Sequence, residues 1–406
     1  MRSSLSLLAL PILLSPLALA ADETTTADQP TSSTSEILLS AAPGHAVNVP
    51  DFPFKSIPAM DYEQVILPGP QFLFSDEPEY IRVPEGVAMR EPVEPGAVRL
   101  YMYNVNGVKE PEQMPRRINA VIRNEGGEDL NLRFLHFSSQ PPSGNYHGVG
   151  KNGLRDYFAS EGLDRTMTLA PGESAPLDSD MESRIANYND LVHGLYEFVI
   201  DQPATVSVVQ TDPETGSAEA SERLAEVIPI EKKKNAGRGK FGVSNYLIRN
   251  REAGVIDTTS GVVQLLVADD ERDPWVRGID SSSGEIVDLA GNYGVMYEIE
   301  LNYKTPDGKG LALVTWNSRF ESSQWCGGMA ASVRVSDGLH EGGIVPIPSN
   351  QLNVRKPPEV AVIQVFPPVP EGETGTIHIT YSPPGASCLP VPLIFVPVDM
   401  DSKSVE

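Results

Sequence analysis

Basic residues are scarce in this chain of 406 residues. It holds 31 Lys and Arg against 55 Asp and Glu, which gives a formal net charge of −24 at pH 7. A surface of that sign repels phosphate backbones, so nucleic acid is excluded as a partner. We expect the acidic charge to serve solubility outside the cell. Cation-dependent association with an anionic envelope polymer is the alternative.

Cysteine is rarer still, with two residues, Cys326 and Cys388, both in the C-terminal third. A structural zinc site takes four nitrogen or sulfur ligands, so two cysteines alone do not build one. In an exported protein an even number of cysteines predicts a disulfide. Closing the loop between Cys326 and Cys388 stabilises the fold by about 4 kcal/mol in the chain-entropy model. Two buried free thiols are the alternative.

Several catalytic motifs are missing. The chain has no Gly-x-Ser-x-Gly, which a serine hydrolase of the α/β type needs at a strand-to-helix turn. Its six histidines form no His-Glu-x-x-His, which disfavours a zinc hydrolase. Cys326 follows Gln324 and Trp325, a neighbourhood only superficially like that of thiol proteases, and we interpret it as a disulfide partner beside a Gly-Gly turn. With 55 acidic residues, no carboxylate pair stands out as glycosidase machinery.

Long hydrophobic runs are also missing, with one exception at residues 5–19. This run is interrupted by two prolines and is shorter than the ~20 residues of a membrane-spanning helix. A basic residue precedes it, and Ala18-Leu19-Ala20 closes it as a small-x-small cleavage site. We therefore predict a signal peptide and a mature chain that begins at Ala21 without a transmembrane segment. The predicted location is the periplasm, the extracellular space or the cell surface.

Proline and glycine, in contrast, are abundant, with 36 and 34 residues. They favour short strands and turns over long helices. The predicted fold class is mainly β, with two antiparallel β-sandwich domains in tandem and few short helices. The expected organisation is a signal peptide at 1–20, a disordered acidic and Thr/Ser-rich leader at 21–45, a first β-sandwich at 46–211 with a Pro-rich lead-in, a linker at 212–240, a second β-sandwich at 241–400 and a tail at 401–406.

Alternating residues mark the individual strands. Residues 97–105 alternate and end at Asn-Gly, and the runs 117–123 and 130–137 flank a Gly, Asn and Asp cluster that predicts an antiparallel hairpin. Helices are expected at 153–161 and 217–227. Further strands are expected at 194–200, 204–210, 261–268, 295–301, 311–316, 330–335, 360–365, 374–381 and 393–398.

Aromatic and acidic residues supply the candidate binding sites. Aromatic side chains gather in the second unit, where they either fill the core or stack on sugar rings. The candidate ligand-binding residues are Tyr293, Asn292, Trp275 and Trp325. The acidic turn with Asp269, Asp270 and Asp273 resembles a calcium loop only in its density of acidic residues, because the spaced EF-hand pattern is missing. We predict no cofactor, with Ca²⁺ in this turn as the alternative.

One stretch resembles a known family. Gly291-Asn292-Tyr293-Gly294 leads into a strand, and the chain also holds a Leu169-Ala170-Pro171-Gly172-Glu173 turn and a Pro-rich Val365-Phe366-Pro367-Pro368 strand. Together with the signal peptide, this resembles a family of exported bacterial proteins, common in cyanobacteria, that is described as a domain of unknown function. The resemblance covers most of residues 60–400 and implies an exported all-β protein with two domains. It implies no catalytic residues, and the acidic leader and the cysteine pair have no match in the family.

These observations predict an exported, non-catalytic envelope or extracellular-matrix protein that binds or scaffolds. The expected partner is an envelope polysaccharide or an envelope protein. One alternative is an extracellular hydrolase that acts on glycans or peptides with loop carboxylates. The other is a structural subunit of a surface assembly that uses unpaired sheet edges.

Overall fold

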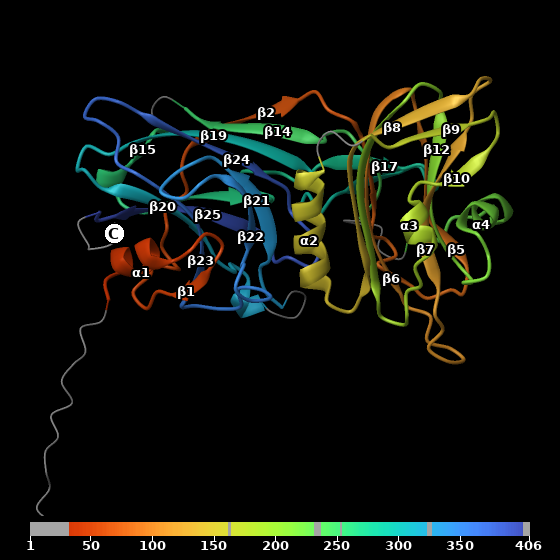
Figure 1. The fold of residues 1–406 in the computed structure, drawn as a ribbon, viewed down its shortest axis with the longest axis horizontal. Helices are drawn as coiled ribbons and strands as arrows, with labels where there is room; N and C mark the ends of the chain where they lie inside the picture. The colour runs from red at the N-terminus through yellow and green to blue at the C-terminus, as the bar shows by residue number, and fades with distance from the viewer. Residues whose placement is uncertain (1–31, 161–163, 231–236, 252–253, 323–326, 401–406) are drawn as a thin grey trace, which may run out of the picture. The chain divides into compact units, whose positions relative to one another are not determined.

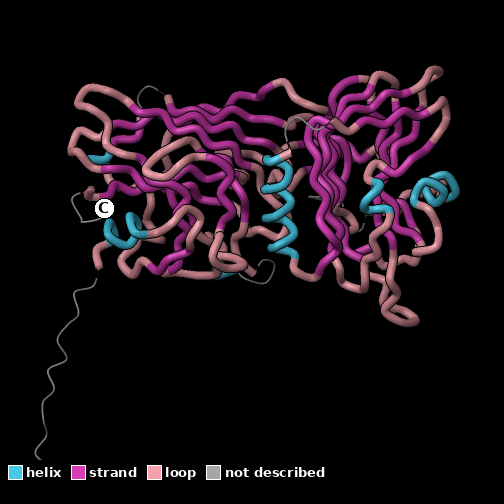
Figure 2. The backbone as a smooth tube through the Cα atoms, viewed as in Figure 1, coloured by secondary structure: helices cyan, strands magenta, loops and turns pink. Residues whose placement is uncertain are grey.

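The computed structural model describes residues 32–160, 164–230, 237–251, 254–322 and 327–400. Within these residues the chain forms 25 β-strands and four α-helices, so the predicted mainly β fold class is confirmed (Figure 2). The predicted signal peptide, most of the predicted leader, the tail, Trp325 and Cys326 lie outside the described residues. No helix within the described ranges is long and apolar enough to span a membrane.

The first sandwich joins a four-stranded and a nine-stranded sheet around one hydrophobic core (Figure 1). The four-stranded sheet has the order β10 (Ser174–Pro176), β7 (Arg117–Asn124), β12 (Ala204–Thr211) and β5 (Gly86–Val93). The nine-stranded sheet has the order β18 (Glu285–Asp288), β17 (Arg277–Asp280), β13 (Arg238–Phe241), β3 (Gln71–Ser75), β6 (Gly96–Asn106), β11 (Leu191–Ile200), β8 (Leu130–Ser143) and β9 (Thr166–Leu169), with β4 (Tyr80–Ile81) beside β6.

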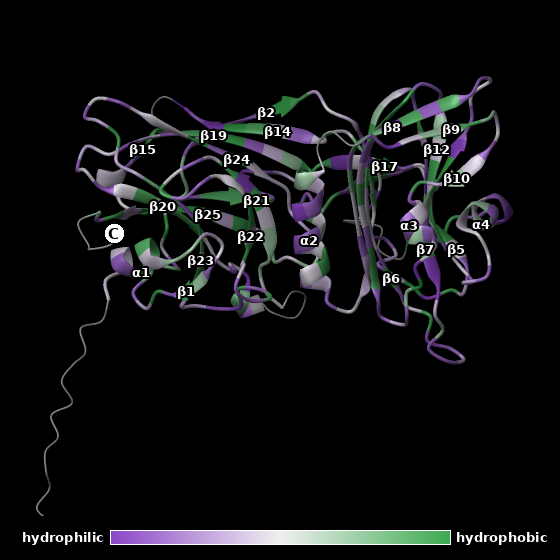
Figure 3. Ribbon diagram, in the orientation of Figure 1, coloured by the Kyte–Doolittle hydropathy of each residue, from purple (hydrophilic) through white to green (hydrophobic). Residues whose placement is uncertain are grey.

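The second sandwich joins a five-stranded and a seven-stranded sheet. The five-stranded sheet has the order β1 (Ala46–Asn48), β23 (Glu359–Phe366), β20 (Gly310–Thr315), β25 (Val391–Val398) and β16 (Val263–Val267). The seven-stranded sheet has the order β2 (Tyr62–Leu67), β14 (Asn245–Asn250), β19 (Met296–Lys304), β24 (Gly375–Tyr381), β21 (Ala331–Val335) and β22 (Gly343–Ile347), with β15 (Ile256–Asp257) beside β19. In Figure 3 the hydrophobic colour is concentrated in the strands, whereas the short helix α4 (Ser217–Arg223) is hydrophilic.

Strand β6 is buried on both faces. Leu100 and Met102 belong to the core of the first sandwich, whereas Tyr101 and Tyr103 belong to the neighbouring core that includes helix α2 (Tyr146–Ala159). Successive side chains of a strand point to opposite faces, so a strand covered on both sides needs a nearly continuous apolar run. This is why residues 97–105 contain so few polar positions.

Helix α2 contacts β8 and β11 of the first sandwich and β21 and β22 of the second. It begins at Tyr146, seven residues before the predicted start. The prediction missed this part of the helix because the first two turns contain glycines, which lower helix propensity. Two of these glycines permit close packing. A Cβ at Gly150 would lie 2.5 Å from the Gly385 carbonyl oxygen, and a Cβ at Gly153 would lie 2.4 Å from Cε1 of His193.

The predicted hairpin of residues 117–123 and 130–137 is wrong. Both strands exist, but β7 lies in the four-stranded sheet and β8 in the nine-stranded sheet. Asn124 directs the connection: its Nδ2 donates to the carbonyl oxygens of Glu128 and Leu169, and its Oδ1 accepts from Gly126 N. Both strands bury alternate residues in the same core, so the periodicity is the same whether they pair or face each other across the sandwich.

Sheet membership also crosses the predicted domain boundaries. Strand β1 pairs with β23 and β2 pairs with β14, so the lead-in before residue 70 joins the second sandwich. Strands β13, β17 and β18 join the first sandwich from beyond the predicted linker. Within the predicted leader, helix α1 (Thr34–Ser40) forms and buries Leu38, which differs from the expected disorder. The pairs β3–β6 and β14–β19 are parallel, so the sheets are mixed rather than purely antiparallel.

Of the two remaining short helices, only the second was predicted. Helix α3 (Ser179–Glu182) is capped by Asp178, whose Oδ1 accepts from the backbone of Asp180 and Met181. Helix α4 begins at Ser217, as predicted, and ends four residues before the predicted end. The strands expected in the second unit are all present as β16, β19, β20, β21, β23, β24 and β25.

Candidate functional site

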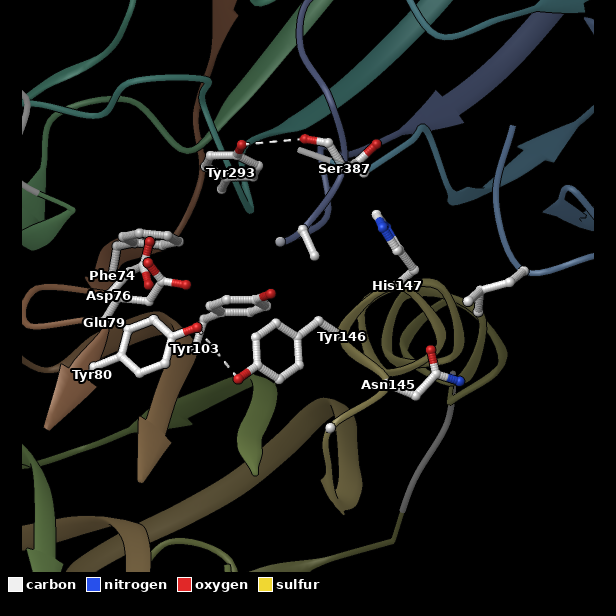
Figure 4. A pocket seen from close by; sticks show the side chains of 15 residues that line it. Phe74, Asp76, Glu79, Tyr80, Tyr103, Asn145, Tyr146, His147, Tyr293 and Ser387 are labelled. Carbon is white, nitrogen blue, oxygen red and sulfur yellow. Dashed lines mark hydrogen bonds between the residues drawn. The ribbon is translucent and has the colours of Figure 1, made fainter. Parts of the chain in front are cut away.

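A pocket of about 750 Å³ lies where the first turn of α2 meets β3, β4, β6 and four loops that adjoin strands of the second sandwich (Figure 4). Its volume is typical of ligand-binding pockets. We call it the aromatic pocket. Its side chains of interest are five rings, two carboxylates, an imidazole and a serine: Phe74, Tyr80, Tyr103, Tyr146, Tyr293, Asp76, Glu79, His147 and Ser387.

The β3–β4 connection supplies one wall. Phe74 lies near the end of β3, and the backbone of Asp76 is fixed by donation from its N–H to the Gly237 carbonyl (2.6 Å). The Glu79 carbonyl accepts from Val105 N of β6 (2.6 Å), which places Tyr80 beside the end of that strand. The side chains of this wall point into the pocket in Figure 4.

The opposite wall is the start of α2. Asn145 caps the helix by accepting from Gly148 N (3.1 Å). The Tyr146 hydroxyl donates to the Asn189 carbonyl (2.9 Å) and lies 3.5 Å from the Tyr80 hydroxyl. The two tyrosines therefore meet from opposite sides of the pocket.

Tyr293 comes from a tight turn before β19. Gly291, Asn292 and Gly294 have φ values of +95°, +49° and +79°, a left-handed conformation that glycine and asparagine tolerate best. Asn292 Oδ1 accepts from Val276 N, and Asn292 Nδ2 donates to the Tyr297 hydroxyl, each at 2.8 Å. The turn is thereby anchored to its surroundings, and the Tyr293 hydroxyl donates to the Ser387 carbonyl (3.3 Å).

The rings of the pocket are ordered against one another. Phe74 stacks on Tyr101 with ring centroids 5.1 Å apart, and it lies nearly parallel to Tyr293 at 6.4 Å and 14°. Burial raises the pKa of Tyr146, and burial together with Asp76 and Glu79 raises the pKa of Tyr293. Both hydroxyls therefore stay protonated and can act as hydrogen-bond donors at any physiological pH.

His147 is neutral in this setting. Burial lowers its pKa, and the nearby Lys151 and Arg355 lower it further. Its Nδ1 has no hydrogen-bond partner among the described residues. Among the described residues no carboxylate orients that nitrogen, so within them His147 and Ser387 lack the Ser-His-Asp arrangement of a serine hydrolase.

A second, smaller pocket of about 370 Å³ borders the first, and we call it the indole pocket. Its lining includes Trp275, Asp269, Arg319, Leu389 and, shared with the aromatic pocket, Tyr293 and Ser387. Trp275 is half-buried, and its Nε1 is buried without a hydrogen-bond partner among the described residues. The ring therefore contributes apolar carbon surface to this pocket.

The predicted ligand-binding residues are placed unequally. Tyr293 lines both pockets and Trp275 lines the indole pocket. Asn292 is fully buried and holds the turn, so the structure gives it a positioning role in place of the predicted ligand contact. Trp325 lies outside the described residues.

The acidic turn uses its oxygens internally. Asp269 Oδ1 accepts from the backbone N–H groups of Glu271, Arg272 and Asp273. Asp273 is fully buried and accepts from Gln64, Tyr297 and Ala268 at 2.6–2.7 Å, and burial raises its pKa. Asp270 accepts a long bond from Trp275 N. Among the described residues no group of three or more His, Cys, Asp or Glu forms a metal site, so calcium here stays a prediction without support.

Cys388 lies in the wall of the indole pocket. It is 1% exposed, and its backbone N–H donates to the Gly328 carbonyl (3.1 Å). Because Cys326 lies outside the described residues, the disulfide stays a prediction.

Most of the aromatic pocket was missed by sequence reasoning. Residues 72–80 contain three rings and three acidic residues, but they lie in a Pro-rich stretch before the first clear strand, which indicated an irregular lead-in. The mixed aromatic and acidic composition of this segment was the available signal. Tyr146 and His147 gave no comparable signal, because the glycines around them hid the helix that positions them.

Comparisons with known proteins supply no family. No protein-family model matches the chain, and no curated protein matches it significantly. Among solved structures, the CUB1-EGF-CUB2 domain of human MASP-1/3 has 8% identity and a TM-score of 0.18, over 76% of this chain and 100% of that chain. The formate complex of Lactobacillus farciminis oxalate decarboxylase has 11% identity and a TM-score of 0.14, over 82% and 86%. TM-scores this low carry no argument about fold or function.

Proposed function

We propose that this protein is an exported, non-catalytic binding protein that takes a polysaccharide of the cell envelope or matrix in the aromatic pocket. The observation that carries the proposal is the set of five aromatic rings around one pocket, of which Tyr80, Tyr146 and Tyr293 are partly exposed. The C–H face of a sugar ring is apolar and packs on aromatic faces, and tyrosine combines such a face with a hydroxyl donor.

The polar groups of the pocket support the same ligand class. The hydroxyl oxygens of Tyr146 and Tyr293, whose protons are donated to the Asn189 and Ser387 carbonyls, are acceptors for sugar hydroxyl groups, and so are the Asp76 and Glu79 carboxylates. Within the described lining residues no Lys or Arg is present to attract an anionic polymer. A neutral glycan therefore fits better than a uronic acid polymer, and the acidic surface as a whole favours the same choice.

Binding to the organism's own polymers tests this function. Residues 21–406 are sedimented with peptidoglycan and with exopolysaccharide, with and without calcium. We expect saturable, calcium-independent binding that falls by about tenfold in Tyr80→Ala and in Tyr146→Ala, a change equivalent to roughly 1.4 kcal/mol. Tyr62→Ala is the matched control, because Tyr62 is a half-buried tyrosine of β2 that lines neither pocket. Absence of binding to every polymer would overturn the proposal.

A glycan hydrolase is the second candidate, because Asp76 and Glu79 line the same pocket. Glycosidases use two carboxylates that flank the scissile bond. Incubation with oligosaccharides, followed by assay of new reducing ends, separates this candidate from simple binding. Turnover that disappears in both Asp76→Asn and Glu79→Gln would favour the hydrolase, and intact substrate with retained binding would favour the binding protein.

A subunit of a surface assembly is the third candidate, favoured by two apolar sheet edges. Ile66 on β2 is 62% exposed, and Ile286 on β18 is 72% exposed. Both strands are edges of their sheets, and edge strands pair readily with other chains. Sedimentation velocity over a range of concentrations tests this candidate, with Ile66→Lys and Ile286→Lys as variants that should abolish any oligomer.

Export can be tested separately by asking whether Cys326 and Cys388 form the proposed disulfide. Alkylation without reduction, followed by mass spectrometry of the protein purified from its native host, counts the free thiols. An exported chain with the disulfide gives no alkylated cysteine before reduction and two after it.

A further inference from the structure

We infer that the ligand is a linear chain of sugars that runs from the aromatic pocket past Tyr293 into the indole pocket. This inference rests on the proposed glycan-binding function and deepens it. A ligand that fills only the aromatic pocket is the competing description, and the two make different predictions about the length of the sugar chain.

The first argument is continuity between the pockets. Tyr293 and Ser387 line both of them, and the Tyr293 hydroxyl donates to the Ser387 carbonyl. This pair is therefore a common wall rather than two separate boundaries. A polymer that leaves the aromatic pocket on this side passes directly over residues that belong to the second pocket.

The second argument is that each pocket offers an aromatic surface of its own. The aromatic pocket has the partly exposed rings of Tyr80, Tyr146 and Tyr293, and the indole pocket has Trp275. Because Nε1 of Trp275 is buried, the surface that the indole presents to the pocket is carbon, which suits the C–H face of a sugar ring. Rings spaced along a groove are the arrangement that a repeating polymer uses and a single sugar does not.

The third argument is that the indole pocket is lined by polar side chains. Asp269 and Arg319 lie at its lining, and the backbone of the acidic turn holds Asp269 in place through three N–H groups. All three of these bonds go to Oδ1, so Oδ2 of Asp269 is the acceptor for a sugar hydroxyl group, and the Arg319 guanidinium, whose Nε donates to the Leu389 carbonyl, supplies donors through its terminal nitrogens. The indole pocket is thus equipped as a second sugar-binding position.

The experiment measures affinity against chain length by isothermal titration calorimetry. The probes are β-linked oligomers of glucose and of N-acetylglucosamine, from the monosaccharide to the hexasaccharide. We expect affinity to rise by about tenfold or more as the chain lengthens enough to enter the indole pocket. Trp275→Ala should remove this increment and leave the affinity for the shortest binding oligomer unchanged, whereas Tyr146→Ala should weaken short and long oligomers alike.

Two further variants guard against misfolding as an explanation. Trp275→Phe keeps an aromatic face and should retain most of the increment. Ala290→Phe, which adds bulk at the lining of the indole pocket, should remove it. All variants are checked by thermal unfolding, and tryptophan fluorescence should respond to long oligomers in the wild type but less in Trp275→Phe.

The outcomes separate the two proposals. If short oligomers bind and affinity does not depend on length, or if Trp275→Ala weakens all lengths equally, the second position is overturned and the binding function stands. If no oligomer binds and no envelope polymer binds either, the proposed function fails together with the inference.

Discussion

The cluster around Asp273 and the aromatic pocket lie on either side of one tight turn, and they use similar residues in opposite ways. On the buried side, Asp273, Tyr297 and Asn292 are fully enclosed and bond to one another. On the other side, Tyr293 and Tyr146 are partly buried and face a pocket. An acid, a tyrosine and an asparagine thus build a scaffold in one place, while tyrosines and acids line a cavity in the other.

The bonding state of a polar side chain, rather than its type, separates scaffold from site. A buried carboxylate whose oxygens accept from the chain itself has no capacity left for a ligand. A hydroxyl at a pocket wall keeps part of its capacity available. Removal of a group from the buried side should therefore weaken the fold, whereas removal of a group from the pocket side should weaken binding.

The largest effect is expected from Asp273→Ala. This change leaves the Tyr297 hydroxyl, the Ala268 N–H and the Gln64 amide without their acceptor in a buried place. We expect the free energy of unfolding to fall by about 4 kcal/mol, as for other losses of a buried polar network. Urea denaturation measures it. Asp270→Gly is the control, because Asp270 is exposed at φ +62° and should change stability by about 1 kcal/mol or less.

A slightly smaller loss of stability is expected at acid pH because of His193, which lies behind the aromatic pocket against Tyr101 and Tyr103. Burial lowers its pKa to about 4, from 6.5 in the unfolded chain. The unfolded chain therefore takes up a proton between these values while the folded chain does not. Stability should fall by about 3 kcal/mol as the pH falls from 6.5 to 4, with no further loss from this group below that.

His193→Leu tests the assignment. Both ring nitrogens of His193 lack hydrogen-bond partners among the described residues, so the substitution removes no hydrogen bond within them. Thermal unfolding between pH 4 and 7 should show a shallower acid limb in the variant. An unchanged limb would place the titration in another group, such as His147, whose pKa is also lowered.

The turn itself gives an intermediate effect. Asn292→Ala removes the acceptor of Val276 N. It also puts alanine at φ +49°, a left-handed conformation that alanine tolerates less well than asparagine. We expect a loss of about 2 kcal/mol. Asn292→Gly loses the same hydrogen bonds but tolerates the backbone, so it should be about 1 kcal/mol more stable than the alanine variant. Equal stabilities would show that the left-handed backbone contributes nothing to the cost.

How much of this could be predicted from the sequence depends on how local each signal is. The strands of the second unit and the Gly-Asn-Tyr-Gly turn follow from periodicity and from the conformational needs of Gly291 and Gly294. The pairing of β7 with β10 and β12 does not, because alternation records only which face is buried. Likewise, residues 46–67 join the second sandwich through contacts with strands about 180 to 300 positions later in the chain.

The candidate site divides in the same way. Tyr293 and Trp275 could be proposed because aromatic residues cluster in sequence around them. Phe74, Tyr80 and Tyr146 become neighbours only when β3, β4 and α2 are brought together, and no local pattern in the sequence records that meeting. Asn292 was predicted as a ligand contact together with Tyr293, whereas its side chain turns inward to bond with Val276 and Tyr297.

The smallest effect makes the sharpest comparison, because it removes one oxygen atom from each side of the turn. The Tyr297 hydroxyl donates to Asp273 (2.7 Å) and accepts from Asn292 (2.8 Å) in a fully buried place. Tyr297→Phe should therefore cost about 1–2 kcal/mol. The Tyr293 hydroxyl makes one long bond at the wall shared by the two pockets, so Tyr293→Phe should change stability by about 0.5 kcal/mol or less.

Binding should show the reverse order. Tyr293→Phe keeps the ring that stands between the two pockets, so glycan affinity should fall only about two- to threefold, the contribution of a single neutral hydrogen bond at the low end of its range. Tyr297→Phe should leave affinity unchanged in the molecules that remain folded. Denaturation and titration of the two variants side by side measure both quantities. If Tyr297→Phe weakened binding more than Tyr293→Phe, the division of the turn into a scaffold side and a binding side would be wrong.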